Sequence, residues 1–444
     1  MSAALEHARD LAAYVTASPT PFHAAAEGLQ RLVAAGYTVV DERATFEAAP
    51  GAYVLVRDGA LVAWRIPSGA GPGTAYRIVG THTDSPGFVL KPHPDLGVAG
   101  WQQLGMEIYG GPLLNSWLDR ELGLAGRVIL ASGEQRLVRT GAIMRIPQLA
   151  IHLDRSVNDD GVKLDRQAHT APVWSVGRPD LKIMDQIALL AGCTVDEIMG
   201  ADLSAYATTP PEIFGPTDEF LASGRLDNLS SVHAGLTALL NLAEVTEFDN
   251  PETFNDPETF DDPGTGGPAI TVLAAFDHEE IGSGSRSGAA GPLLADVLSR
   301  ISAALGGSFD DHQRALAASI CLSADTGHAV HPNYVQRHDP ANRPLLNGGP
   351  LLKLNANQRY ATDAVGAAIW RRACRAAGVP TQEFVSNNAI PCGSTIGPLT
   401  ATRLGIRTVD VGIPLLSMHS ARELAGVWDP LFLRRAIEAF FRQV

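Results

Sequence analysis

Two apolar runs in this chain end in residues that could perform chemistry. The first ends in His82-Thr-Asp84, and the second, far along the chain, ends in Glu279-Glu280. A neutral imidazole is a common metal ligand, and a carboxylate two residues away can fix its tautomer. Neighbouring residues on a strand or tight turn point in different directions, so one glutamate can bind a metal while the other acts as a base. The two runs together predict a metal-dependent hydrolase.

Five candidate metal ligands lie at the ends of expected strands or the starts of expected helices: His82, Asp227, Glu280, Asp325 and His419. In open α/β sheets, sites form beyond the carboxyl ends of the strands. Two histidines and three carboxylates suit Zn²⁺, with Co²⁺ or Mn²⁺ as rivals in one or both positions. Five ligands are too many for one zinc with an open position, so two ions that share a bridging carboxylate fit better. Glu279 would take the proton of a water acidified by such a pair.

Each of these residues also has an ordinary explanation when it is considered alone. A single His-x-Asp is common in loops, and two adjacent glutamates usually mark a solvated helix start. Asp227 could simply cap its helix, and His419 could cap the segment that follows it. The coincidence favours the metal site, because several independent strand ends each finish in a ligand type.

Composition limits the class of protein. A length of 444 residues suggests two domains, and 45% hydrophobic residues provide ample core. The formal charge is 34 − 48 = −14, and no basic cluster stands out, so nucleic acid is not an expected partner. The four cysteines lack CxxC spacing and the first eleven residues are partly charged, which favours a cytoplasmic protein. The apolar run 269–276 is too short to span a bilayer, so no membrane partner is expected.

Hydrophobic periodicity predicts the elements that position these residues. Helices are expected near the N-terminus (5–15 and 22–35), followed by strands at 53–56, 61–65 and 76–80. A long helix is expected to open at Asp227, and strand–helix alternation follows it, at 270–276, 289–305, 318–323, 361–377, 407–411 and 431–441. This alternation predicts an α/β fold: a three-layer sandwich around a mixed, largely parallel sheet.

The middle of the chain has a different pattern of hydrophobic residues. Residues 92–218 contain short β-like runs, at 106–109, 126–130 and 142–146, and a helical run at 181–199. The economical explanation is an inserted β-rich domain at 92–218, with a discontinuous catalytic domain formed by 1–91 and 219–444. The acidic, proline-rich repeat Phe248–Pro263 is expected to be a solvated loop.

The chain resembles the aspartyl aminopeptidase family of zinc metallopeptidases over essentially its whole length. The matching segments are Thr81–Pro86, Ser116–Arg127, Ile146–His152, Ser223–Asn228, Asp277–Glu280, Ser323–Tyr334, Lys353–Tyr360, Cys392–Pro398 and Met418–Ser420. The resemblance implies that Asp227 bridges two zinc ions. His82 and Asp325 would complete one site, and Glu280 and His419 the other. Glu279 would be the general base and Asp84 the partner of His82.

The resemblance also implies substrate contacts by His152, His328, Lys353 and Tyr360. An ammonium in a partly desolvated pocket would select Asp or Glu at the first position of a peptide, although the net charge is negative. Without the resemblance, Lys353 would be interpreted as a surface lysine on an edge strand, and His152 as a satisfied core histidine.

The family fold has a dimerisation domain where this chain has its inserted domain, and the members that this chain resembles assemble as tetrahedral dodecamers. The resemblance therefore implies a homododecamer in which His152 reaches the site of a partner subunit and stabilises the oxyanion there. His278 departs from the eukaryotic pattern, where Asn is usual, and so does the acidic repeat. Neither departure removes a ligand.

The expected function is the release of N-terminal Asp or Glu from peptides. One rival is a co-catalytic zinc aminopeptidase with broad or neutral specificity. Another is a self-assembling scaffold or binding protein with structural metals, which would cleave nothing. The presence of Glu279 argues against the scaffold, because a structural site needs no base.

Overall fold

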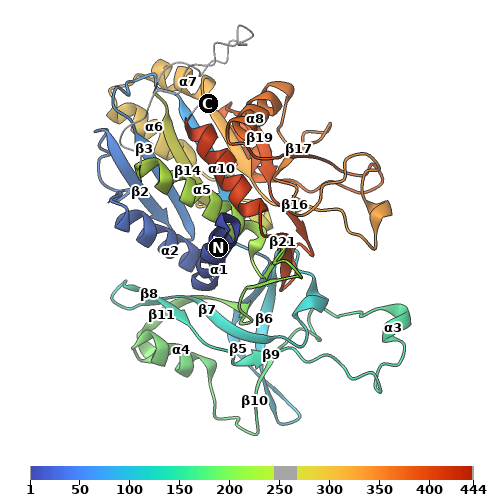
Figure 1. Ribbon diagram of the computed structural model, residues 1–444. Helices are drawn as coiled ribbons and strands as arrows, with labels where there is room; N and C mark the ends of the chain where they lie inside the picture. Colours follow the sequence, from blue (N-terminus) through green and yellow to red (C-terminus); the bar gives the residue numbers. More distant parts are fainter. Residues whose placement is uncertain (1, 245–267, 443–444) are drawn as a thin grey trace.

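The computed structural model describes residues 2–244 and 268–442 and shows two bodies, one above the other (Figure 1). The upper body is built on a sheet of nine strands and carries both ends of the described chain. The lower body is a second sheet with two short α-helices. The acidic repeat Phe248–Pro263 lies outside the described residues.

The large sheet is mixed. Its strands are β1 (Thr38–Val39), β2 (Gly51–Arg57), β3 (Ala60–Ile66), β4 (Tyr76–His82), β14 (Ile270–Phe276), β15 (Ile320–Ala324), β17 (Leu351–Leu354), β18 (Gln382–Val385) and β19 (Arg407–Gly412). They lie in the order β1-β2-β3-β14-β4-β15-β19-β17-β18. The four central strands, β14, β4, β15 and β19, are parallel to one another, whereas β3 and β17 run antiparallel beside them. The predicted mixed α/β class is therefore confirmed.

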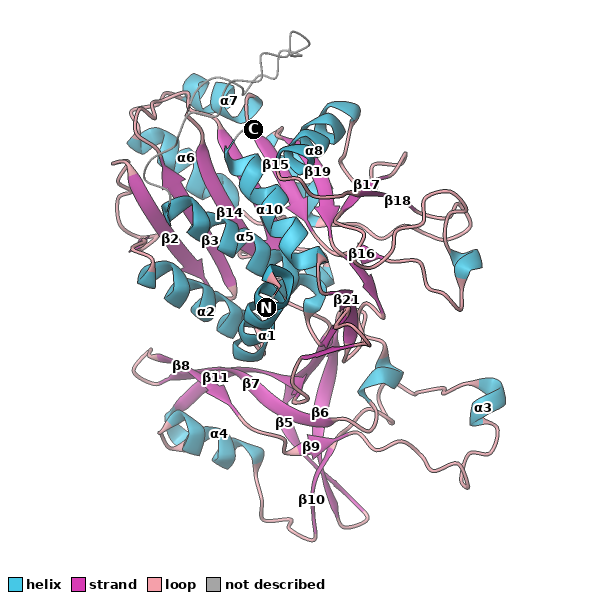
Figure 2. Cartoon of the chain, in the orientation of Figure 1, coloured by secondary structure: helices cyan, strands magenta, loops and turns pink. Residues whose placement is uncertain are grey.

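Alternating side chains of the central strands enter two different cores. On β4, Val79 belongs to one hydrophobic cluster and Ile78 to another. The Val79 cluster packs under α1 (Ala3–Ala17), α2 (Pro21–Ala34), α5 (Leu226–Glu244), α8 (Ala364–Ala376) and α10 (Asp429–Arg442). The Ile78 cluster packs under α6 (Leu293–Ala304), α7 (Phe309–Ala317) and α9 (Ile396–Leu404). Figure 2 shows the strands of this sheet among their helices. Because helices cover both faces, every residue of β4, β14 and β15 is buried.

The lower body is formed by the β-rich middle of the chain. Its strands are β5 (Gly87–Val98), β6 (Trp101–Tyr109), β7 (Glu121–Leu130), β8 (Gln135–Arg139), β9 (Met144–Arg145), β10 (Val173–Val176) and β11 (Ile198–Ala207). Strand β11 pairs with both β5 and β7, so the pairings close into a ring. Helix α4 (Ile183–Ala191) packs against β7 and β8, and the four-residue helix α3 (Val157–Asp160) lies in the long loop before β10.

A small third sheet joins segments that are far apart in sequence. It contains β12 (Glu212–Phe214), β13 (Phe220–Ser223), β16 (Gly327–His328), β20 (Pro414–Leu416) and β21 (Glu423–Gly426). Strand β13 leaves the β-rich segment and pairs with β21 near the end of the chain. This pairing places the loops after β13 and before β21 side by side.

The structure corrects two expectations about local structure. The run 181–199 is not one helix: α4 ends at Ala191, because Gly192 adopts a left-handed conformation with φ 67° and caps it. From Ile198 the chain continues as β11. Helix α5 begins at Leu226, but Asp227 and Asn228 have non-helical backbone angles, so Asp227 does not act as an ordinary cap. No helix within 2–244 or 268–442 is long and apolar enough to cross a membrane.

Candidate metal centre

Three of the predicted ligands follow from the order of the central strands. His82 is the last residue of β4, Glu280 lies in the turn after β14, and Asp325 directly follows β15. Because β14, β4 and β15 are adjacent and parallel, their carboxyl ends meet at one edge of the sheet. The other two lie beside the small third sheet: Asp227 in the non-helical first turn of α5, shortly after β13, and His419 in the loop between β20 and β21.

Asp227 lies at the centre of the group. Its Oδ1 is 3.3 Å from Nε2 of His82, which is itself 3.4 Å from Oδ1 of Asp325. Its Oδ2 is 3.5 Å from Nε2 of His419, which is 3.5 Å from Oε2 of Glu280. The contacts divide the side chains into two groups that share Asp227.

The side chains fit a bound cation. His82, Asp227 and Glu280 each present a ligand atom within 4.8 Å of the others. Oδ1 of Asp227 is buried and makes no hydrogen bond within the described residues, which is costly unless a cation or another donor compensates. Imidazole nitrogen and carboxylate oxygen are the donor types that zinc prefers in catalytic sites.

The charges of this group depend strongly on one another. Burial and the Asp227 charge raise the pKa of Glu280, and burial with nearby carboxylates raises the pKa of Glu279 to about 7. Burial alone would raise the pKa of Asp227, but His419 and His82 hold it well below its usual range. Burial opposes protonation of His419, yet Asp227 raises its pKa to about 9. A divalent cation would relieve this crowding of carboxylates and lower their pKa values.

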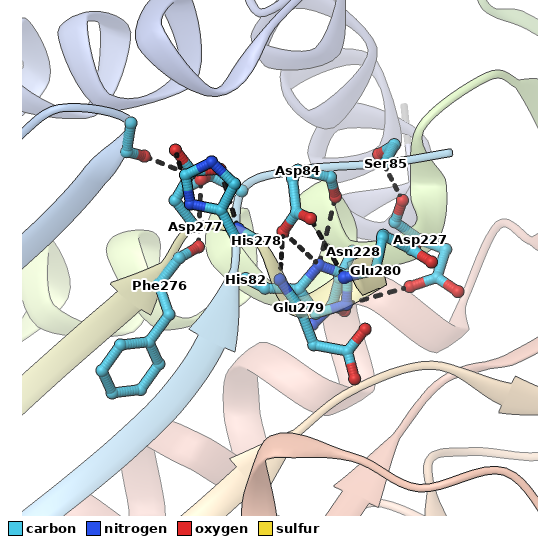
Figure 3. Close-up of polar contacts among 12 residues, drawn as sticks. His82, Asp84, Ser85, Asp227, Asn228, Phe276, Asp277, His278, Glu279 and Glu280 are labelled. Carbon is cyan, nitrogen blue, oxygen red and sulfur yellow. Dashed lines mark hydrogen bonds and ion pairs between the residues drawn. The ribbon is translucent and has the colours of Figure 1, made fainter. Parts of the chain in front are cut away.

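Asp84 organises one side of the centre, as Figure 3 shows. It is fully buried, with Oδ1 3.3 Å from Nδ1 of His82. Its two oxygens accept hydrogen bonds from the backbone amides of Glu279 and Glu280, both at 3.0 Å. The hydroxyl of Tyr109 donates a further bond at 2.8 Å. Asp84 therefore orients the imidazole and also fixes the turn that carries the two glutamates.

A cleft of about 410 Å³ opens onto the metal centre. All five predicted ligands line it, and so do Glu279, His328, Lys353 and Tyr360. A second cavity, of about 570 Å³, lies between the two bodies and shares Asp227 and His419 with the cleft. The smaller cleft is the candidate active site, because it contains the base and the predicted substrate contacts.

Lys353 is buried, contrary to its interpretation as a surface lysine. Strand β17 lies between β19 and β18, and only 1% of the residue is exposed. Its Nζ donates a hydrogen bond of 2.6 Å to the carbonyl of Thr326 and lies 3.7 Å from Oδ2 of Asp325. The ring of Tyr360 lies beneath it, at 5.3 Å from Nζ to the ring centroid. The ammonium is therefore held beside the ligands at the floor of the cleft.

His328 and His152 occupy different surroundings. His328 faces the cleft, where partial enclosure and the Lys353 ammonium lower its pKa, and its ring contacts Phe384 edge-on. His152 is exposed in the loop between β9 and β10, in the lower body, so it is not a core histidine. The described residues that line the cleft include none from that loop. A single chain thus brings together every predicted site residue except His152.

Sequence reasoning missed Glu423 and Tyr109. Burial and the Asp227 charge raise the pKa of Glu423 to about 8, although the amides of Asp227 and His419 both donate hydrogen bonds to it. Its position four residues after His419 was the only signal, and it resembled an ordinary helix-start acid. Tyr109, within β6, gave no signal, because an aromatic residue in a strand is usually core.

Comparison with known proteins agrees with this geometry. The family model described as aminopeptidase I zinc metalloprotease (M18) matches residues 14–441. A probable M18 family aminopeptidase 2 of Streptomyces coelicolor is 51% identical over 440 residues, covering 98% of both chains. The fold is similar to that of Ape4 in its complex with Nbr1, with a TM-score of 0.91, 33% identity and coverage of 99% and 86%. For the yeast mApe1 dodecamer the TM-score is 0.83, with 27% identity and coverage of 99% and 97%.

These matches span nearly the whole chain. The 51% identity to the Streptomyces coelicolor protein is far above the level at which relatives share a family. The resemblance stated from the sequence motifs is therefore confirmed. The chain belongs to the M18 family of aminopeptidases, which are zinc metallopeptidases.

Proposed function

We propose that this chain releases aspartate or glutamate from the N-terminus of peptides through a two-zinc site. The observation that carries the specificity is the buried Lys353 beside the metal centre. In this proposal His82 and Asp325 would hold one ion, Glu280 and His419 would hold the other, and Asp227 would serve both.

The surroundings of Lys353 favour a role in binding an anion. An ammonium group has three donors, and the structure shows one hydrogen bond from it, to Thr326, within the described residues. Asp325 lies beyond hydrogen-bond distance at 3.7 Å. Donors therefore remain for the side-chain carboxylate of a substrate. In a desolvated pocket such a charge pair discriminates strongly against neutral side chains, because they offer no acceptor to the remaining donors of the ammonium.

The protein groups account for the proton transfers. Zinc, when bound, supplies Lewis-acid polarisation of the scissile carbonyl and acidifies water. The Glu279 carboxylate accepts the proton of the attacking water and then delivers it to the nitrogen of the leaving peptide. Asp84 holds the amide of Glu279, so the carboxylate is kept at the edge of the cleft. Tyr360 and His328 line the space next to Lys353 and would position the substrate.

Assembly is part of the proposal. We place the dimerisation domain in the β-rich segment 92–218 and the catalytic domain in 1–91 and 219–444. His152 lies exposed on the β-rich body, away from the cleft of its own chain. It would stabilise the tetrahedral oxyanion in the site of the partner subunit. The yeast mApe1 structure is a dodecamer, which supports a tetrahedral dodecamer here.

Replacement of Lys353 by methionine tests the specificity. Loss of a buried charge pair costs about 2–5 kcal/mol, so kcat/KM for an Asp-amide should fall by roughly 30- to 5,000-fold. The value for a Leu-amide should change little, because a neutral side chain gains nothing from the ammonium. The measurement is steady-state hydrolysis of both amides at saturating zinc.

Lys91→Met is the matched control, since Lys91 lies on β5 of the lower body and does not line the cleft. It should leave both rates unchanged. Equal losses for the acidic and the neutral substrate in Lys353→Met would contradict the specificity. They would assign Lys353 instead to the support of Asp325.

A further inference from the structure

The segments that carry Asp227 and His419 are attached to two paired strands, since Asp227 follows β13 and His419 precedes β21. Ser223, the last residue of β13, lies opposite Glu423, the first residue of β21. Asp227 follows Ser223 by four residues, and His419 precedes Glu423 by four residues. The sheet register therefore sets both loops at the same end of the strand pair.

The two loops are also in close contact. A Cβ atom on Gly224 would lie 2.9 Å from the carbonyl oxygen of Ala421, so this position needs a residue without a side chain. The hydroxyl of Ser116 accepts a hydrogen bond of 2.9 Å from the amide of Ala421, which ties the second loop to the lower body. The separation of the loops is therefore closely constrained.

Glu423 connects the loops directly. Its Oε2 accepts a hydrogen bond of 3.0 Å from the backbone amide of Asp227, and its Oε1 accepts one of 2.8 Å from the amide of His419. The side chains of Asp227 and His419 also approach each other, with Oδ2 of Asp227 3.5 Å from Nε2 of His419. One carboxyl group thus holds the backbone amides of two residues whose side chains converge on the metal centre.

We propose that Glu423 is a positioning residue of the metal centre, which sets the distance between the bridging Asp227 and His419. The inference rests on the proposed metal site and adds a residue that the mechanism does not use. Asp84 makes the same kind of contact elsewhere in the metal centre, because its two oxygens accept hydrogen bonds from the amides of Glu279 and Glu280.

Packing alone does not explain a glutamate at this position. Glu423 is only 2% exposed, and a carboxylate in such surroundings is unfavourable unless its oxygens are satisfied. Here both oxygens accept hydrogen bonds from the backbone amides of Asp227 and His419, which are themselves proposed metal ligands.

Glu423→Gln tests the inference. Glutamine has nearly the same shape, but its NH₂ group would face one of the two amides as donor against donor, so one loop should loosen. The readouts are the affinity of the metal-stripped protein for Zn²⁺, by competition with a chromophoric chelator, and the absorption spectrum with Co²⁺. Affinity should fall by about 10- to 100-fold, and the Co²⁺ spectrum should change.

Asp429→Asn is the matched control. Asp429 is equally buried and also accepts two backbone amides, from Asn347 at 2.6 Å and Gly349 at 3.0 Å, but it does not line the cleft. It should lower the melting temperature without changing zinc affinity or the Co²⁺ spectrum. If Glu423→Gln does not fold, Glu423→Asp keeps the carboxyl group with a shorter reach and should lose affinity by a smaller factor.

Zinc affinity and a Co²⁺ spectrum like those of the wild type in the folded Glu423 variants would overturn the inference while leaving the proposed function intact. A wild-type protein that binds no Zn²⁺ would overturn both. The two failures are therefore distinguishable.

Discussion

Glu279→Gln is expected to lower kcat by about 10²- to 10⁴-fold while the protein keeps its fold and its metal. Glutamine preserves the shape of the side chain but cannot accept the proton of the attacking water. The amide of residue 279 would still bind Asp84, so the turn should keep its conformation. The measurement combines single-substrate kinetics with metal content of the purified variant.

The adjacent residue supplies the control. Glu280→Gln is the same chemical change one position along, on a side chain that contacts His419 rather than facing the substrate as a base. It should lose metal affinity together with activity, and excess zinc should restore part of that activity. Excess zinc should not rescue Glu279→Gln. Near-normal turnover in Glu279→Gln would remove Glu279 from the mechanism.

Asp227→Asn is expected to impair both metal positions at once. The two oxygens of Asp227 face different histidines, His82 and His419, so one substitution weakens both groups. Metal catalysis contributes several kcal/mol to such reactions, which corresponds to at least roughly a thousandfold loss of activity. Metal content measured after gel filtration should fall well below that of the wild type.

Asp10→Asn separates this effect from the simple loss of an aspartate–histidine hydrogen bond. Oδ2 of Asp10 lies 2.6 Å from Nε2 of His233, between α1 and α5, so it forms a similar aspartate–histidine contact away from the cleft. This variant should be less stable but should retain metal and kcat. Retention of both ions by Asp227→Asn would show that Asp227 does not bridge them.

The sequence was sufficient for the parts of the site that depend on strand ends. Apolar runs before His82, Glu280 and Asp325 identify buried parallel strands, and parallel strands bring their carboxyl ends to one edge. The strand 270–276 was predicted with the bounds that β14 has. Asp227 and His419 were predicted as ligands only from their residue types and the motifs around them. Their positions in the fold depend on the pairing of β13 with β21, which no local sequence pattern reveals.

Other features depend on tertiary contacts and could not be predicted. Whether Lys353 is buried depends on β18, which covers the edge of β17. Glu423 acquires its role only when two loops that are distant in sequence meet around it. The helix expected at 181–199 was wrong beyond Ala191, because Gly192 ends it and the following residues find partners on β7.

The most direct test of the whole account is hydrolysis of Asp-, Glu-, Leu- and Lys-amides by the purified protein, before and after chelation and again after zinc is restored. Cleavage should disappear when the metal is removed, return with zinc and favour the Asp- and Glu-amides. Metal-dependent cleavage that favours the Leu-amide would keep the zinc pair but contradict the acidic specificity assigned to Lys353. Cleavage that persists in the metal-free protein would contradict the metal centre itself.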